Sequence, residues 1–322
     1  MKPLVTIIIP VRNRASLITW TLDSIIASTH RPLWLFIVDN GSTDETKSVC
    51  DDWANRHRSS TLRVDVIEEP KAGAPAARNA GLRRVETRYV YFFDSDDRFS
   101  SDFLEDIERA LRENRENPAE SEWDLLFVPV RQGKNGSMRV RDHEKSDRAA
   151  VQIISSMLST HSMVFRTDWL RQIGAWDERL TIWQDWELGV RALLNRPHLC
   201  WATEKSYHEI LLHEDSITGA SLVDRWEGTL ESMRVALEDV RTAKDLTKHE
   251  RRSCLRALYL RAMIQAGRLL REHCPVGSQA YMDYAKDVIG HPTKPLRMWG
   301  MVLRNYVARR GRGAWRVARQ LV

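Results

Sequence analysis

The chain has little cysteine and no long apolar run. Its four cysteines, among 322 residues, form no CxxC pair. This argues against a zinc ribbon or a secreted disulfide scaffold and favours reduced thiols in the cytoplasm. No run of ~18 apolar residues is present to form a spanning helix. The N-terminal apolar segment, Val5–Pro10, is short and followed by charge, which predicts a strand and not a signal peptide.

A glycine-rich phosphate loop is also missing. The first apolar segment continues as PVRNR, so no GxGxxG follows the first predicted strand and a Rossmann oxidoreductase is disfavoured. A nucleotidyltransferase with a related βαβ core would also carry a glycine-rich loop here, and it stays the weaker alternative.

Apolar and helical segments alternate through the first 130 residues. The predicted strands are Val5–Pro10, Leu33–Asp39, Leu62–Ile67, Tyr89–Asp94 and Trp123–Val130. Ile18 and Leu22 begin a helical apolar face after the first strand. Ser42 with Glu45 predicts a capping box for the next helix. This alternation is typical of parallel βαβ units.

Polar residues follow three of these strands, at Pro10–Arg14, Asp39–Thr43 and Asp94–Asp97. Ligands of open α/β sheets bind at the carboxyl ends of strands. The segment FFDSDD places three aspartates within four positions, and like charges at ~5 Å repel by roughly 3 kcal/mol. A bound cation would relieve this repulsion; a solvated acidic turn is the alternative.

The C-terminal region reads as successive helices from about Asp224 onward. Its last stretch, RMWGMVLRNYVARRGRGAWRVARQLV, has seven arginines and no acidic residue. Such a basic amphipathic surface can bind anionic lipid, and a solvated helix packed on the rest of the chain is the alternative. No recognised module supports nucleic-acid binding.

Four motifs occur in order: PVRN, VDNGSTD, ARNAGL and FFDSDD. Together they resemble the GT-A-fold family 2 glycosyltransferases of bacterial cell-surface glycan synthesis, over roughly residues 4–220. The resemblance implies an α/β fold: a Rossmann-like GT-A domain with a mixed central sheet at residues 1–222, then a helical, basic region at 223–322.

The resemblance also implies a site for a nucleotide-diphosphate sugar and a divalent cation, Mn²⁺ or Mg²⁺. The residues matching the donor-binding positions are Pro10, Arg12, Asn13, Asp39, Asn40, Arg78 and Asp96. The matching metal positions are Asp97, Asp96 and His213, with Asp94 holding the loop. Many members carry an aromatic residue in place of Arg12 and an aspartate in place of Asn40.

A carboxylate must also take the proton of the attacking hydroxyl. In the family it comes from an acidic pair at a helix start; here the pair is Gln184–Asp185, so the resemblance implies Asp185 as general base with inversion of the sugar. A capping aspartate is the structural alternative. Trp183 and His161 are expected to face the acceptor.

The sequence therefore predicts a metal-dependent, inverting glycosyltransferase, a hexosyl- or related sugar transferase. Its expected donor is UDP-, GDP- or dTDP-linked, and its acceptor a glycan or lipid-linked glycan. We expect a cytoplasmic protein, peripheral on the inner face of the membrane if the basic helices bind lipid. A non-catalytic nucleotide-sugar-binding module is the remaining alternative.

Overall fold

A computed structural model describes residues 2–28, 30–113, 122–134, 137–140, 146–201, 208–211 and 221–322. The chain divides into two compact units. Unit 1 comprises residues 1–142, 159–181 and 197–213, and unit 2 comprises residues 143–158, 182–196 and 214–322. The predicted domain boundary between residues 222 and 223 stays a prediction. Unit 2 also contains residues 143–158 and 182–196, which precede that boundary.

Unit 1 contains a seven-stranded sheet, which is mixed as the family resemblance implies. In spatial order its strands are β10 (Leu199–Trp201), β6 (Leu125–Phe127), β9 (Met163–Arg166), β4 (Tyr89–Phe92), β1 (Val5–Val11), β2 (Leu33–Asp39) and β3 (Leu62–Glu68). All neighbours are parallel except β9, which runs antiparallel to both β4 and β6. The predicted strand Trp123–Val130 is shorter in the structure, because it is divided between β6 and the start of β7.

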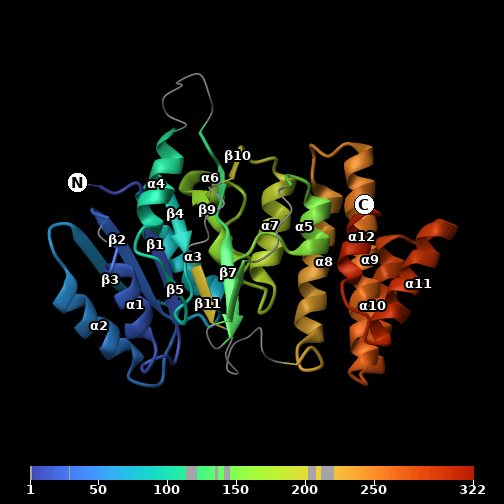
Figure 1. Cartoon of the computed structure of the whole chain (residues 1–322), viewed down its shortest axis with the longest axis horizontal. Helices are drawn as coiled ribbons and strands as arrows, with labels where there is room; N and C mark the ends of the chain where they lie inside the picture. The colour runs from blue at the N-terminus through green and yellow to red at the C-terminus, as the bar shows by residue number, and fades with distance from the viewer. Residues whose placement is uncertain are drawn as a thin grey trace. The chain divides into compact units, whose positions relative to one another are not determined.

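Helices cover both faces of this sheet. Helices α1 (Ile18–Ile26), α2 (Thr46–His57) and α4 (Phe103–Glu113) form one apolar core with Ile7 and Ile9 of β1. Figure 1 shows α1 and α2 over β1–β3. Helix α3 (Ala74–Arg84) packs on β1 and β2. Gly81 permits that close approach, since a Cβ there would lie 2.7 Å from Ile8 Cγ2.

The predicted capping box is wrong in detail. Helix α2 begins at Thr46, and neither Ser42 nor Glu45 caps it with a side chain. Asp44 Oδ1 instead accepts from the Thr46 amide at 3.0 Å. Ser42 Oγ accepts from the Asn13 amide at 3.0 Å, so Ser42 joins two loops and does not start a helix.

Unit 1 has further short elements. A second sheet contains β5 (Arg98–Phe99), β11 (His208–Leu211), β7 (Val130–Lys134) and β8 (Ser137–Val140). The 3₁₀ turn η1 (Thr160–Ser162) enters β9, and α6 (Thr167–Gln172) follows it. His161 and Ser162 therefore lie in the 3₁₀ turn, and the strand begins at Met163.

Unit 2 is helical where the structure describes it, in agreement with the predicted helical region. Its helices are α5 (Ala149–Ser155), α7 (Gln184–Leu194), α8 (Trp226–Thr242), α9 (Lys248–Arg271), α10 (Pro275–Val288), α11 (Lys294–Ala308) and α12 (Ala314–Arg319). Thr247 and Glu250 form a capping box at the start of α9. Within the described ranges, no helix is both long and apolar enough to cross a bilayer.

Candidate functional site

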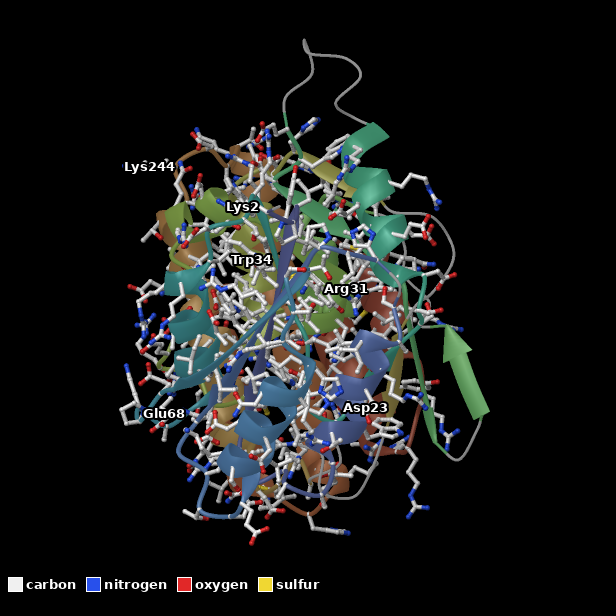
Figure 2. All side chains as sticks on the ribbon, turned by 90° about the vertical axis from the view of Figure 1, so that its left-hand side faces the viewer. Lys2, Asp23, Arg31, Trp34, Glu68 and Lys244 are labelled. Atoms are coloured by element: carbon white, nitrogen blue, oxygen red, sulfur yellow. The ribbon has the colours of Figure 1, made fainter. Side chains whose placement is uncertain are left out.

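The predicted polar strand ends lie at one edge of the large sheet. Strands β4, β1 and β2 are adjacent and parallel, so the residues after them converge. Figure 2 places Lys2, which precedes β1, and Glu68, which ends β3, at opposite ends of the strands. The carboxyl-end edge thus gathers Asp94–Asp97, Arg12–Arg14 and Asp39–Asn40.

His161 reaches this edge because β9 is antiparallel. Tyr91 of β4 pairs with Val164 of β9, and the 3₁₀ turn that carries His161 and leads into β9 packs against β4. The hydroxyl of Tyr91 donates to the His161 carbonyl at 3.1 Å. The path of the backbone therefore brings the His161 ring next to the Asp94–Asp97 loop, which is distant from it in the sequence.

The His161 ring lies between two carboxylates. Its Nε2 is 2.6 Å from Asp97 Oδ2 and 3.5 Å from Asp94 Oδ2. His161 is 5% exposed and Asp97 is 3% exposed. Burial lowers the pKa of His161, but the charges of Asp97 and Asp94 outweigh it and raise the pKa to about 9. Without a metal ion, the imidazolium supplies a positive charge to the acidic loop; a metal ion held by His161 would displace this proton.

Arg78 supplies a second positive charge to the loop. Its Nη2 lies 2.8 Å from Asp94 Oδ1, and its guanidinium lies 4.4 Å from the ring centre of Trp176. Burial raises the pKa of Asp94, yet His161 and Arg78 outweigh burial and hold that pKa below its ordinary value. Asp94 is thus ionised and held from two sides.

Asp94, Asp97 and His161 form a group that could hold a metal ion. One ligand atom from each lies within 4.8 Å of the others. Two carboxylates and an imidazole suit a cation such as Mn²⁺. Asp96, predicted as a metal ligand, is not in this group; its Oδ2 lies 3.9 Å from Arg14 Nη2. His213, also predicted, lies outside the described residues.

Asp39 offers a buried oxygen toward the same edge. Its side chain is 5% exposed, and Oδ2 accepts from the Ser42 amide at 3.2 Å. Within the part of the chain that the structure describes, Oδ1 has no hydrogen-bond partner. A buried, unsatisfied carboxylate oxygen is costly, so a ligand that donates an N–H or O–H here would be bound favourably.

Asn40 and Asn13 shape the loops around this edge. Asn40 Nδ2 donates to the carbonyls of Glu69 and Lys71 at 2.9 and 2.7 Å, and Oδ1 accepts from the Gly73 amide at 2.8 Å. Asn13, at φ +51°, accepts from the Thr43 amide at 2.8 Å. Asn40 and Asn13 were both predicted to bind the sugar donor. Their side chains are hydrogen-bonded to backbone amides or carbonyls of neighbouring loops.

Pro10 and Arg12, the two remaining residues predicted to bind the sugar donor, differ in exposure. Pro10 is buried within β1 opposite Val38 of β2, whereas Arg12 is exposed just beyond the strand. Pro10 thus shapes the strand end, and Arg12 is accessible to a ligand.

Asp185 and Trp183 belong to unit 2. Asp185 is half-buried in the first turn of α7, where its Oδ1 accepts from the Trp186 amide at 2.8 Å. Trp183, at φ +55°, precedes the helix. The guanidinium of Arg261 lies 4.3 Å from the ring centre of Trp183 and 5.1 Å from that of Trp186. Stacking on Arg261 therefore holds the helix start that carries the predicted base.

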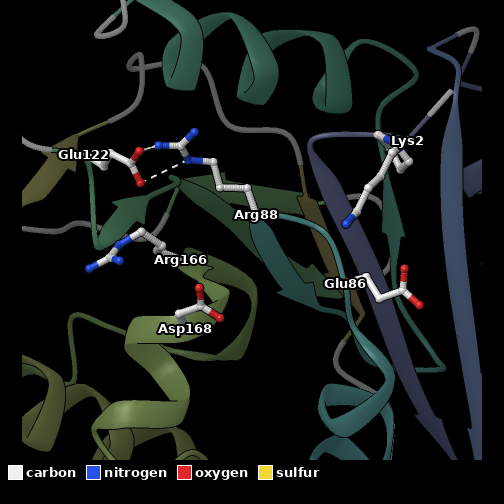
Figure 3. Close-up of a pocket in the computed structure, with 7 residues that line it drawn as sticks. Lys2, Glu86, Arg88, Glu122, Arg166 and Asp168 are labelled. Carbon is white, nitrogen blue, oxygen red and sulfur yellow. Dashed lines mark hydrogen bonds and ion pairs between the residues drawn. The ribbon is translucent and has the colours of Figure 1, made fainter. Parts of the chain in front are cut away.

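A cavity of about 500 Å³ lies at the opposite edge of the large sheet. It is lined by residues such as Lys2 before β1, and Glu86 and Arg88 before β4. Figure 3 shows Arg88 directed toward Glu122, with Arg166 and Asp168 below them in this view. This cavity lies at the amino ends of parallel strands, where open α/β sheets do not place their ligands.

Arg14 was not predicted as a site residue, and Asp94 was predicted only to hold the loop. The repeated aspartates of DSDD were a signal for Asp94, but Arg14 stands among several arginines without a distinguishing pattern. His161 was predicted to face the acceptor, which stays a prediction; in the structure its Nε2 lies 2.6 Å from Asp97 Oδ2.

Comparison with known proteins identifies a family that matches this chain. The family described as "Glycosyl transferase family 2" matches residues 6–174, more than half of the chain. The minor teichoic acid biosynthesis protein GgaB of Bacillus subtilis is 25% identical over 210 residues, which are 63% of this chain and 22% of GgaB. The matched region spans less than half the length of the curated relatives.

Two solved structures share the fold. Residues 1–349 of S. aureus TarS, in complex with UDP-GlcNAc, superpose with a TM-score of 0.70 at 20% identity, covering 98% of this chain and 90% of that one. The mannosyltransferase PcManGT of Pyrobaculum calidifontis, in complex with GDP-Man and Mn²⁺, gives 0.58 at 16% identity, covering 99% and 88%.

Proposed function

Because the chain belongs to glycosyl transferase family 2, we propose that it moves a sugar from a nucleotide diphosphate to a hydroxyl of a glycan or lipid-linked glycan. Its relatives suggest bacterial cell-surface glycan synthesis as the setting. The observation that carries the proposal is the Asp94–Asp97–His161 group, which lies at the same strand edge as the unsatisfied oxygen of Asp39.

The nucleoside would bind at Asp39. Its Oδ1 can accept one hydrogen bond from a base N–H or a ribose hydroxyl. Arg12 is exposed beside it and can stack on a base. Asn13 and Asn40 would act by holding the loops. The complexes of TarS with UDP-GlcNAc and PcManGT with GDP-Man indicate that this fold accepts both nucleotides.

A divalent cation fits the acidic loop. Asp94 and Asp97 supply hard oxygen ligands within reach of His161. When bound there, Mn²⁺ or Mg²⁺ would neutralise the charge that develops on the leaving diphosphate. Arg78 holds Asp94 by its 2.8 Å ion pair. We assign His161 to this donor side and not to the acceptor, since its ring faces Asp97.

Asp185 would act as the base on the acceptor side. Its carboxylate takes the proton of the acceptor hydroxyl as that oxygen forms a bond to the anomeric carbon. The bond from this carbon to the diphosphate oxygen breaks, and the nucleoside diphosphate leaves with the electron pair. Attack from the face opposite the leaving group inverts the carbon. Trp183, held by Arg261 beside the helix start, would pack on the acceptor sugar.

The test compares Asp185→Asn with a matched control. Asp168→Asn removes an acid whose side chain is 86% exposed and which lines the cavity at the opposite sheet edge. We expect Asp185→Asn to lower transfer by about 10²–10⁴-fold while binding of UDP or GDP with Mn²⁺ is unchanged, and Asp168→Asn to behave as wild type. If Asp185→Asn transferred sugar at the wild-type rate, the assignment of Asp185 as the general base would be refuted.

The same assays separate the alternatives. A nucleotidyltransferase would consume a nucleoside triphosphate and release pyrophosphate. A binding module would bind UDP or GDP with Mn²⁺ and neither transfer nor hydrolyse a bound sugar. Either result from the wild-type protein would overturn the proposed reaction.

A further inference from the structure

Helix α11 has two apolar faces, and one is already covered. Gly300, Leu303 and Val307 are buried, and the helix packs on α9 through this face. Gly267 of α9 lies against the Arg304 carbonyl so closely that a Cβ could not be accommodated. Helix α11 is therefore firmly anchored, and its second face is not needed for packing on α9.

The second face is exposed. Among the described residues, eight large apolar side chains are at least 36% exposed, and five belong to this helix of 15 residues. They are Met298, Trp299, Met301, Val302 and Tyr306. Single exposed apolar residues are ordinary, but a contiguous patch indicates an interaction site. We name these five residues the α11 patch.

The spacing of the patch makes it continuous along the helix. Met298, Val302 and Tyr306 follow one another four residues apart, which places them in a row on one side. They are 57%, 48% and 49% exposed. A row of this kind can enter an apolar medium while the buried face stays on α9.

Cations flank the α11 patch at both ends. Lys294 and Arg297 lie in the first turn, and Arg309, Arg310 and Arg312 follow the last; all five are exposed. The chain has no acidic residue from His291 to Val322. The arginines after the last turn complement the helix dipole, but a lysine at the helix start opposes it, so the N-terminal charge does not serve the stability of α11 itself.

We propose that α11 binds the surface of an anionic bilayer, with the patch at the acyl boundary and the flanking cations at lipid phosphates. An interfacial helix has this arrangement of apolar and basic residues. At ~22 Å the helix is shorter than the ~30 Å hydrocarbon core, so it lies along the membrane. A second copy of the chain would bring like charges together, which disfavours self-association.

A lipid-linked acceptor of the proposed function would lie in this bilayer surface, and in this respect the inference rests on the proposed function. Binding itself requires neither donor nor metal. Vesicle binding is therefore measured without both, so that failure of the transfer reaction and failure of this proposal give different results.

The experiment is co-sedimentation of the full chain with phosphatidylcholine vesicles, with and without phosphatidylglycerol. We expect binding only to the anionic vesicles, and weaker binding at high salt. The double variants Met298→Ser/Val302→Ser and Arg309→Gln/Arg310→Gln should each reduce the bound fraction at least about fivefold. Both sets of side chains are exposed, so the thermal unfolding midpoint should stay at the wild-type value.

Val276→Ser is the matched control. Val276 is 70% exposed and lies on α10, outside the patch, so this variant should bind as wild type. Equal binding of wild type to neutral and anionic vesicles, or wild-type binding by the Met298/Val302 variant, would overturn the proposal. So would a patch variant that turns a dimer into a monomer in sedimentation velocity and keeps its vesicle binding.

Discussion

Nε2 of His161 lies 2.6 Å from Oδ2 of Asp97, and both side chains are almost fully buried. The ion pair forms within unit 1 at the carboxyl end of β4. Because the imidazolium also lies 3.5 Å from Asp94, it compensates two carboxylates at once.

Replacement of His161 by alanine should therefore destabilise the metal-free protein. Removing one partner of a buried ion pair leaves an uncompensated charge, at a cost of about 3–5 kcal/mol. Urea unfolding measures the change. Mn²⁺ should restore part of the stability, since it can take over the lost positive charge. His249→Ala, at an exposed position, should unfold as wild type, and an unshifted midpoint for His161→Ala would contradict the role of the pair.

Asn40→Asp tests whether Asn40 shapes a loop. Its amide donates to two carbonyls, and a carboxylate there would face them with no proton to donate. We expect a loss of about 2–3 kcal/mol, the cost of leaving buried groups unsatisfied. Thermal unfolding measures it, with the exposed Asn55→Asp as control. If Asn40→Asp keeps wild-type stability and changes only UDP or GDP affinity, Asn40 contacts the donor instead.

Arg261→Lys tests whether Arg261 holds the first turn of α7 in place. The guanidinium stacks on Trp183 and donates to the carbonyls of Ile153 and Ile154 at 2.8 and 2.9 Å. Lysine keeps the charge but loses the planar fork, so we expect about 1–2 kcal/mol of destabilisation.

The kinetic readout of Arg261→Lys separates positioning from general damage. The kcat for transfer should fall several-fold, because Asp185 is misplaced, while the donor KM is unchanged. Arg256→Lys, exposed on the same helix, is the control. A donor KM that rises with kcat unchanged would argue against the role of Arg261 in placing α7.

Asp239 should make stability depend on pH. Burial, and then the charge of Glu187, raises the pKa of Asp239 to about 7. The folded state therefore holds a proton that the unfolded state releases near pH 4, and stability falls as pH rises from about 4 to about 7. The full effect is of order 1–4 kcal/mol.

Asp239→Asn removes this titration. Relative to wild type, the variant should gain stability as the pH rises from about 4 to about 7, and thermal unfolding across that range measures the difference. Glu231→Gln, at an exposed position of the same helix, should follow the wild-type curve. A constant difference between Asp239→Asn and wild type at all pH values would show that Asp239 does not titrate in this range.

Much of the fold follows from local sequence patterns. Val5–Pro10 and Leu33–Asp39 were predicted as strands and form β1 and β2, and the helix start expected at Gln184–Asp185 begins α7. Apolar runs and helical periodicity depend on neighbouring residues, so a single chain reveals them. The polar strand ends were predictable for the same reason, once parallel strands were inferred.

The pairing of His161 with Asp97 could not be predicted in this way. It depends on the insertion of the four-residue antiparallel strand β9 between β4 and β6, a long-range choice with no local signature. The start of α2 was missed because Asp44 and Ser42 are both good capping residues, and the link from Asn13 to Ser42 decides between them. The acidic site is therefore formed by strand pairing between distant parts of the chain, which composition does not reveal.

The central claim is that Asp94, Asp97 and His161 hold a divalent cation beside a nucleotide diphosphate. Calorimetric titration of UDP and GDP, with and without Mn²⁺, tests it directly in wild type, Asp97→Asn and the control Asp168→Asn. The account predicts that Mn²⁺ strengthens binding of at least one nucleotide about tenfold or more to wild type and the control, and that Asp97→Asn abolishes this gain. Equal nucleotide affinity of Asp97→Asn and wild type in the presence of Mn²⁺ would contradict it.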